Sequence, residues 1–107
     1  MRSYFVYILS SSCNSVLYIG VTGNLERRIA QHRQKTISGF SSRYNLKKLV
    51  LLEETTDIRS ALERENQLKN WSRTKKRRLI EMTNPYWIDL LPEQQTDPST
   101  PLSLRSG

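Results

Sequence analysis

Two runs near the start of the chain decide its fold: Tyr4-Phe5-Val6-Tyr7-Ile8-Leu9 and Val16-Leu17-Tyr18-Ile19-Gly20-Val21. Both are rich in the β-branched and aromatic residues that favour strands. The polar segment between them, Ser10 to Ser15, has the length and composition of a turn. The two runs therefore predict a β-hairpin.

The rest of the ordered chain predicts one more strand and three helices. Thr22-Gly23-Asn24 offers a turn and an N-cap for the first helix, and Pro85 ends the last one. The expected elements are a helix over 25–34, a strand over 46–54, a helix from the cap at 56–57 to about 71, and a helix from 72 or 74 to before 85, with a loop at 39–42. The order ββαβαα indicates an α+β fold with a small three-stranded sheet flanked by helices.

Composition and charge point to one domain with a polyanionic partner. The chain has 107 residues and a net charge of +7, and residues 1–90 hold all but one of its 17 Lys and Arg. A strongly basic folded part suits nucleic acid. Residues 91–107 are polar and punctuated by proline, so we expect a domain over 1–90 and a flexible polar tail over 91–107.

Several classes of protein are excluded. No apolar run approaches the roughly 18 residues of a membrane span, and the start of the chain lacks a signal-peptide cleavage site. The single cysteine, Cys13, rules out an internal disulfide and a thiolate-rich zinc site. We expect a soluble cytoplasmic protein without a membrane or disulfide-linked partner. The sequence leaves the oligomeric state open.

Polar residues interrupt the apolar stripes of two predicted helices. Counting from Leu25 at helical spacing gives Arg28, Ile29 and His32, and the same count from Ile58 in the long helix puts Glu65 where a hydrophobe belongs. One interpretation is a structural ion pair between Arg28 and Glu65, or side chains that reach solvent. The other is a cleft in which Glu65 holds a divalent cation and Arg28 a phosphate. His32 is either a core residue or part of that cleft.

Tyr7 and Tyr18 lie near the middle of the two hairpin strands, so both hydroxyls can be presented at one sheet surface. Gly20 follows on the same strand face as Tyr18. A glycine within a strand often marks the close approach of a ligand or backbone, and we therefore expect an open face there.

A basic run opens the last helix. Cations in its first turns oppose the helix dipole, so stability does not explain them, and they suit contacts with phosphates. The expected nucleic-acid-binding set is Gly20, Arg27, Arg43, Lys69, Arg73, Lys75, Lys76 and Arg77.

These residues resemble the GIY-YIG nuclease superfamily, and in particular its small stand-alone bacterial members. Phe5-Val6-Tyr7 and Leu17-Tyr18-Ile19-Gly20 resemble the paired signature, with ten residues between the tyrosines and Phe5 in place of a glycine. The segments 24–32 and 63–71 resemble the Arg-x-x-x-His helix and the metal-binding glutamate helix of the family. The resemblance spans about residues 4–90.

The resemblance implies hydrolysis of phosphodiester bonds with one Mg²⁺ or Mn²⁺ ion. Tyr7 would act as or orient the general base, with a neighbouring cation such as Arg28 favouring the phenolate. Tyr18 would supply a second hydroxyl, Arg28 would neutralise the phosphate, His32 would assist it, and Glu65 would bind the metal. One carboxylate ligand implies weak metal binding without substrate.

The sequence thus favours a metal-dependent endonuclease that acts on DNA, with a structure-specific role in repair or recombination. The alternative is a non-catalytic nucleic-acid-binding module that keeps the fold and the basic face. A protein-interaction domain would leave the inward polar residues without a purpose.

Overall fold

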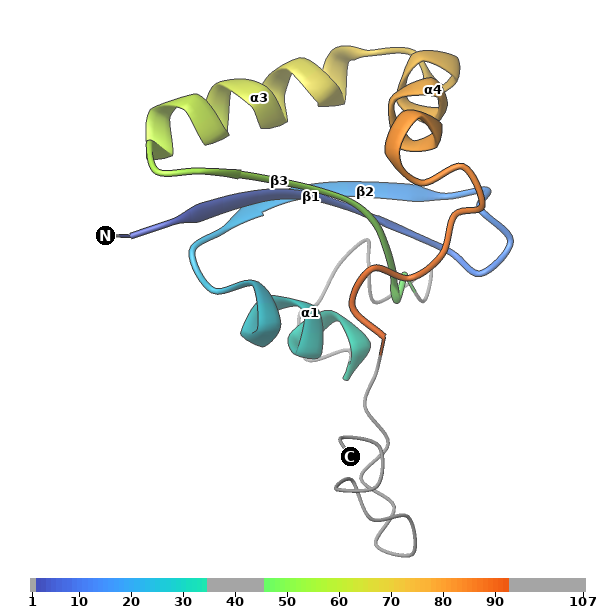
Figure 1. Cartoon of the computed structure of the whole chain (residues 1–107), viewed down its shortest axis with the longest axis horizontal. Coiled ribbons are helices and arrows are strands. Elements are labelled where there is room, and N and C mark those ends of the chain that lie inside the picture. Colours follow the sequence, from blue (N-terminus) through green and yellow to red (C-terminus); the bar gives the residue numbers. More distant parts are fainter. Residues whose placement is uncertain (1, 35–45, 93–107) are drawn as a thin grey trace, which may run out of the picture.

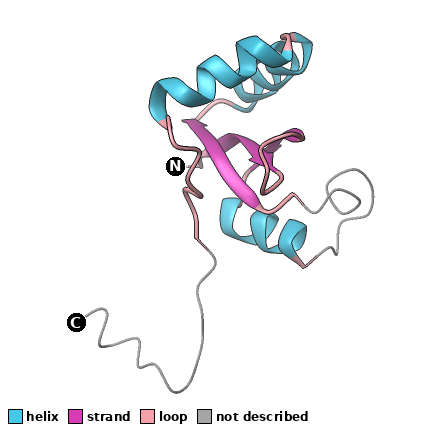
Figure 2. Ribbon diagram, turned by 90° about the vertical axis from the view of Figure 1, so that its right-hand side faces the viewer, coloured by secondary structure: helices cyan, strands magenta, loops and turns pink. Residues whose placement is uncertain are grey.

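A computed structural model describes residues 2–34 and 46–92. Three antiparallel strands form a sheet in the order β2-β1-β3, with α1 on one face and α3 and α4 on the other (Figure 1). Figure 2 shows the same three layers from the side. The elements are β1 (Tyr4–Ser10), β2 (Leu17–Thr22), α1 (Leu25–Arg33), β3 (Lys48–Thr55), α3 (Ile58–Asn70) and α4 (Arg73–Thr83).

The predicted α+β fold and its ββαβαα order are confirmed. β1 and β2 form the expected hairpin, in which Tyr7 pairs with Gly20 and Leu9 with Tyr18. Because side chains alternate across a strand, these four positions share one face of the sheet.

The central strand β1 supplies side chains to both layers of the core. Val6 and Ile8 pack with the helices α3 and α4, whereas Tyr7 and Leu9 pack with Ile29 of α1. Burial on both sides explains why the run 4–9 is apolar throughout rather than alternating.

Each helix begins at a polar N-cap. Asn24, Asp57 and Ser72 accept hydrogen bonds from backbone N–H groups in the first turns of α1, α3 and α4. These side chains satisfy N–H groups that the helices cannot pair themselves, and they fix where each helix starts.

The apolar stripe expected on α3 is only partly correct. Ala61 and Leu68 are buried, but Ile58 and Leu62 are exposed. α3 rests on the sheet with a narrow line of contact, so its outer stripe positions face solvent. None of the helices in the described ranges has the length and hydrophobicity needed to cross a bilayer.

The segment after α4 returns to the edge of β3 and extends the folded part beyond residue 90. The backbone N–H of Leu90 donates to the carbonyl of Leu49, and the Asp89 carboxylate accepts from the N–H of Leu49. Leu91, which we expected in the tail, packs against the core on the α1 side. The rest of the expected tail, 93–107, and the expected loop at 39–42 lie outside the described residues.

Candidate functional site

Tyr7 is the centre of a polar cluster on the α1 face of the sheet. Its side chain is 1% exposed, and its hydroxyl is hydrogen-bonded to Nε2 of His32 at 3.0 Å. The end of its ring lies over Gly20, so the hydroxyl sits above the edge strand β2.

Two aromatic rings, those of Tyr18 and His32, lie beside the ring of Tyr7. The centroids of Tyr7 and Tyr18 lie 6.4 Å apart, and His32 meets Tyr7 at 5.8 Å and Tyr18 at 5.1 Å, both edge to face. The prediction that the two tyrosines share one sheet surface is confirmed. His32, at 1% exposure, joins them from α1.

The open face expected above Gly20 is wrong. A Cβ built on Gly20 would lie 2.4 Å from the Tyr7 hydroxyl oxygen and 2.5 Å from its Cζ. The close approach that the glycine permits is therefore that of Tyr7 itself. The missing side chain of Gly20 leaves the space that the end of the Tyr7 ring occupies.

Two opposite charges from opposite faces act on the Tyr7 hydroxyl. Burial raises the pKa of Tyr7 well above its ordinary value, the neighbouring Tyr18 and the Glu65 carboxylate raise that pKa further, and the Arg28 guanidinium lowers it. Although α1 and α3 lie on opposite faces of the sheet, Arg28 and Glu65 thus both influence the pKa of the same hydroxyl.

Arg28 favours the phenolate, as expected, but its effect does not decide the protonation state of Tyr7. Desolvation of the anion outweighs the attraction of the guanidinium, so Tyr7 keeps its proton at neutral pH. Burial and the nearby Arg28 cation also lower the pKa of His32 to about 4, so its imidazole is neutral. One of its nitrogens is then able to accept a proton.

The depressed pKa of His32 predicts a pH-dependent stability. Because the pKa falls from 6.5 to about 4 on folding, the unfolded chain binds more protons between these values. The stabilisation is complete above pH 6.5 and is lost as the pH falls toward 4, by about 3 kcal/mol. Urea unfolding of wild type and His32→Gln at pH 7 and 4.5 measures this. An equal loss of stability in both proteins would contradict it.

Glu65 is the carboxylate available for a metal at this site. Its side chain is 21% exposed, and Oε2 lies 3.2 Å from Nζ of Lys69. No group of three or more His, Cys, Asp or Glu that could hold a metal occurs within 2–34 and 46–92. One carboxylate does not make a metal cage, but it fits Mg²⁺, which keeps waters and shares its shell with substrate phosphates.

Comparison with known proteins agrees with this arrangement. Residues 3–78 match the GIY-YIG catalytic domain. This range contains Tyr7, Tyr18, Arg28, His32 and Glu65. The chain belongs to the GIY-YIG family.

Small GIY-YIG relatives match along most of their own length. The chain is 35% identical to a UPF0213 protein of Natronomonas pharaonis over 77 residues, which cover 72% of this chain and 89% of the relative. It is 37% identical to a UPF0213 protein of Syntrophus aciditrophicus over 86 residues, covering 79% and 97%. The solution structure of a UPF0213 protein from Bacillus halodurans superposes with a TM-score of 0.53 at 26% identity, covering 79% of this chain and 89% of that one.

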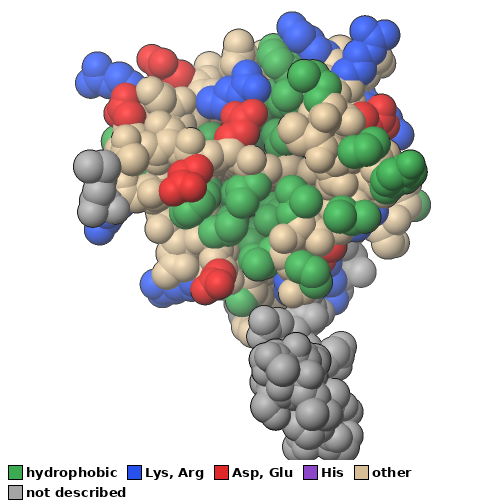
Figure 3. Space-filling view, in the orientation of Figure 1, with side chains coloured by type: hydrophobic (Ala, Val, Ile, Leu, Met, Phe, Trp, Pro, Cys, Tyr) green, Lys and Arg blue, Asp and Glu red, His purple; other side chains and the backbone are tan. Residues whose placement is uncertain are grey.

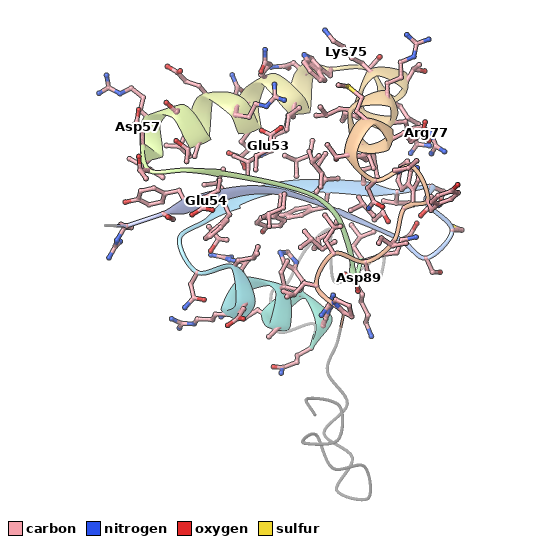
Figure 4. The ribbon with its side chains drawn as sticks, in the orientation of Figure 1. Glu53, Glu54, Asp57, Lys75, Arg77 and Asp89 are labelled. Carbon is pink, nitrogen blue, oxygen red and sulfur yellow. The ribbon has the colours of Figure 1, made fainter. Side chains whose placement is uncertain are left out.

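Several cations of the GIY-YIG domain have partners within the chain. Arg77 donates to the carbonyl of Asn14 at 3.0 Å and stacks over Trp87 at 4.7 Å, and Arg73 donates to the carbonyl of Ser15. Arg77 accordingly extends from α4 toward the β1–β2 turn (Figure 4). These contacts hold the turn against α4.

The argument that stability does not explain the cations of α4 is therefore wrong for part of the run. Besides Arg77, Lys75 lies 4.2 Å from the ring of Trp71, a cation–π contact that offsets an unfavourable helix dipole. Lys76 is half-buried, and Lys69 pairs with Glu65. Arg43 lies outside the described residues.

One face of the GIY-YIG domain is not basic. Figure 3 shows hydrophobic side chains across the middle of this face and Lys and Arg side chains mainly around its margin. A polyanion would find little attraction there. Sequence reasoning missed one cation, Arg2, which lines a cavity together with Arg27 and Arg28.

Proposed function

We propose that this protein is a metal-dependent endonuclease that hydrolyses phosphodiester bonds of DNA. The observation that carries the proposal is the buried hydroxyl of Tyr7, which is hydrogen-bonded to His32 and whose pKa responds to both the Arg28 guanidinium and the Glu65 carboxylate. The two charged side chains are only partly buried, so a substrate phosphate and a cation can reach them from solvent. A phosphate would give Arg28 an anionic partner, and a cation would join Lys69 as a partner of Glu65.

In this mechanism the proton of the attacking water passes through Tyr7 to His32. His32 takes the tautomer with its proton on Nδ1, so that Nε2 accepts from the Tyr7 hydroxyl at 3.0 Å. As the hydroxyl gives its proton to Nε2, it receives that of the water. Tyr7 therefore never has to persist as a buried phenolate, the state that its raised pKa makes unfavourable.

The substrate itself makes His32 a better proton acceptor. In the free protein, burial and Arg28 hold the pKa of His32 at about 4. A phosphodiester bound by Arg28 brings negative charge, which counters the effect of the guanidinium and raises the pKa of His32. Proton transfer is thus favoured only when a phosphate is in place.

Glu65 would hold the divalent cation, together with water and phosphate oxygens. When bound, Mg²⁺ or Mn²⁺ supplies Lewis-acid stabilisation of the negative charge that develops on the phosphate. Arg28 contributes a second, bidentate contact to the same charge. Its guanidinium forms no ion pair within the described residues, so it does not have to leave a partner.

We propose that the enzyme selects DNA by its structure rather than its sequence, as in repair or recombination. The cations assigned here suit phosphates, and phosphate contacts position a protein without reading bases. Bent or branched DNA presents phosphates at angles that a continuous duplex does not.

A cleavage panel tests the proposal. Single-stranded, duplex, nicked and branched DNA are incubated with Mg²⁺ or Mn²⁺, using wild type, Arg28→Ala and Arg59→Ala. We expect wild type and Arg59→Ala to cut alike and Arg28→Ala to lose about 100-fold or more, the effect of removing a transition-state donor. Arg59→Ala is the matched control, because Arg59 is exposed on α3 and its replacement removes the same charge. Binding that weakens with salt but no cleavage by wild type would instead favour the non-catalytic module.

A further inference from the structure

A polar cavity of about 540 Å³ adjoins the candidate site at the start of α1. Three guanidinium side chains line it: Arg2 before β1, and Arg27 and Arg28 in α1. No Asp or Glu is among its lining residues. The cavity therefore gathers positive charge in an open hollow, which attracts anions more strongly than the same charges on a flat surface.

No ion pair or hydrogen bond joins the guanidinium groups of Arg2, Arg27 or Arg28 to another residue within 2–34 and 46–92, in contrast to Arg33, Arg64, Arg73 and Arg77. The ion pairs within 2–34 and 46–92 join Arg33 to Asp89, Arg64 to Glu53 and Lys69 to Glu65. Arg73 and Arg77 donate to the β1–β2 turn. Arg33, Arg64, Arg73 and Arg77 therefore have a structural role in the fold. None of these contacts involves Arg2, Arg27 or Arg28.

The wall of the cavity favours the same kind of ligand. Asn24, the N-cap of α1, lies in the lining, so the positive end of the helix dipole meets the cavity. Thr22 and Gln31 also line the cavity, and the Thr22 hydroxyl donates to the carbonyl of Asn24, which fixes the turn before the helix. The volume far exceeds the roughly 30 Å³ share of one water, so a phosphate can enter with its sugar.

We propose that this cavity binds the phosphate adjacent to the scissile one on the same nucleic-acid strand. The assignment rests on the proposed function, because Arg28 lines the cavity and lies one helical turn before His32, the hydrogen-bond partner of Tyr7. Because the three arginines line one cavity, a strand whose scissile phosphate lies at Arg28 would bring a neighbouring phosphate to Arg2 and Arg27. The substrate class is thus a strand with at least two consecutive phosphates, not an isolated phosphodiester.

Binding of short thymidine dinucleotides tests the assignment. The three probes carry only the internal phosphate, an added 5′ phosphate or an added 3′ phosphate, and titrations are made by NMR in EDTA so that nothing is cut. One of the two added phosphates should raise affinity about tenfold through charge-assisted hydrogen bonds. Which one does so gives the polarity of the strand.

Matched variants locate the effect. Arg2→Ala and Arg27→Ala should reduce the tenfold gain to threefold or less, whereas Arg59→Ala should keep it. A gain from neither phosphate, a gain that survives both Arg2→Ala and Arg27→Ala, or inorganic phosphate binding as tightly as the best dinucleotide would each overturn the assignment. The last result would indicate a site for a free anion.

The outcome is separable from that of the cleavage panel. A tenfold gain in a protein that cuts no DNA leaves the phosphate site standing and removes the catalytic proposal. Cleavage that depends on Arg28, combined with no gain in affinity from an added phosphate, supports the catalytic proposal and removes the phosphate site.

Discussion

Glu65→Gln should reduce DNA cleavage by at least about 10³-fold while leaving the fold intact. The substitution keeps the size of the side chain but removes the charge through which a single carboxylate holds Mg²⁺ or Mn²⁺. The loss of the exposed pair with Lys69 should cost less than about 1 kcal/mol of stability. Rates are measured on the best substrate of the panel with saturating Mn²⁺.

Glu63→Gln is the matched control, because Glu63 lies in α3 two residues earlier and is exposed. It changes the net charge equally and should cut within twofold of wild type. If Glu65→Gln stays within fivefold of wild type when both are purified identically, Glu65 is not a metal ligand. If both variants lose activity alike, the effect is one of overall charge.

The hairpin and its polar face could be predicted because they depend on local patterns. Apolar runs on either side of a polar turn give two antiparallel strands, and period-two alternation then puts Tyr7 and Tyr18 on one face. Helical spacing likewise brought His32 to the inner side of α1. By contrast, Ile58 and Leu62 lie on the inward side of α3 by helical spacing but are exposed. Helical spacing predicts which side of a helix faces the sheet, but it does not predict how many residues on that side the sheet covers.

The partners of the cations could not be predicted, because they are remote in sequence. Arg77 contacts Asn14, 63 residues away, and stacks on Trp87, and both contacts depend on how α4 packs against the sheet. Arg77 and Arg28 contribute equally to the net charge of the sequence. Of the two, it is Arg77 whose contacts hold α4 against the rest of the fold.

The position of Arg2 could not be predicted from the hairpin register. The ladder between β1 and β2 ends at Phe5 and Thr22, and the chain then turns into α1, so register does not relate Arg2 to Arg28. The identity of the group above Gly20 also needed coordinates, because both a ligand and a side chain can fill the space that a glycine leaves.

Gly20→Ala should remove most of the activity by displacing Tyr7. The new methyl would lie 2.4 Å from the hydroxyl oxygen, and the ring, at 1% exposure between Tyr18 and His32, has no free space to enter. We expect a loss of about 1 to 3 kcal/mol in stability from overpacking and about 100-fold in rate, the usual cost of moving a reacting group by 1 Å. Urea unfolding and the cleavage rate measure the two effects.

A double-mutant cycle shows whether Tyr7 is the cause. In a Tyr7→Leu background the side chain is too short to meet the added methyl, so Gly20→Ala should cost less than about 0.5 kcal/mol there. Gly23→Ala, whose Cβ would lie 3.8 Å from the ring of Tyr4, should likewise leave stability nearly unchanged. An equal destabilisation by Gly20→Ala in both backgrounds would trace the effect to the strand backbone. Full cleavage activity in Gly20→Ala would mean that catalysis does not depend on where the Tyr7 hydroxyl lies.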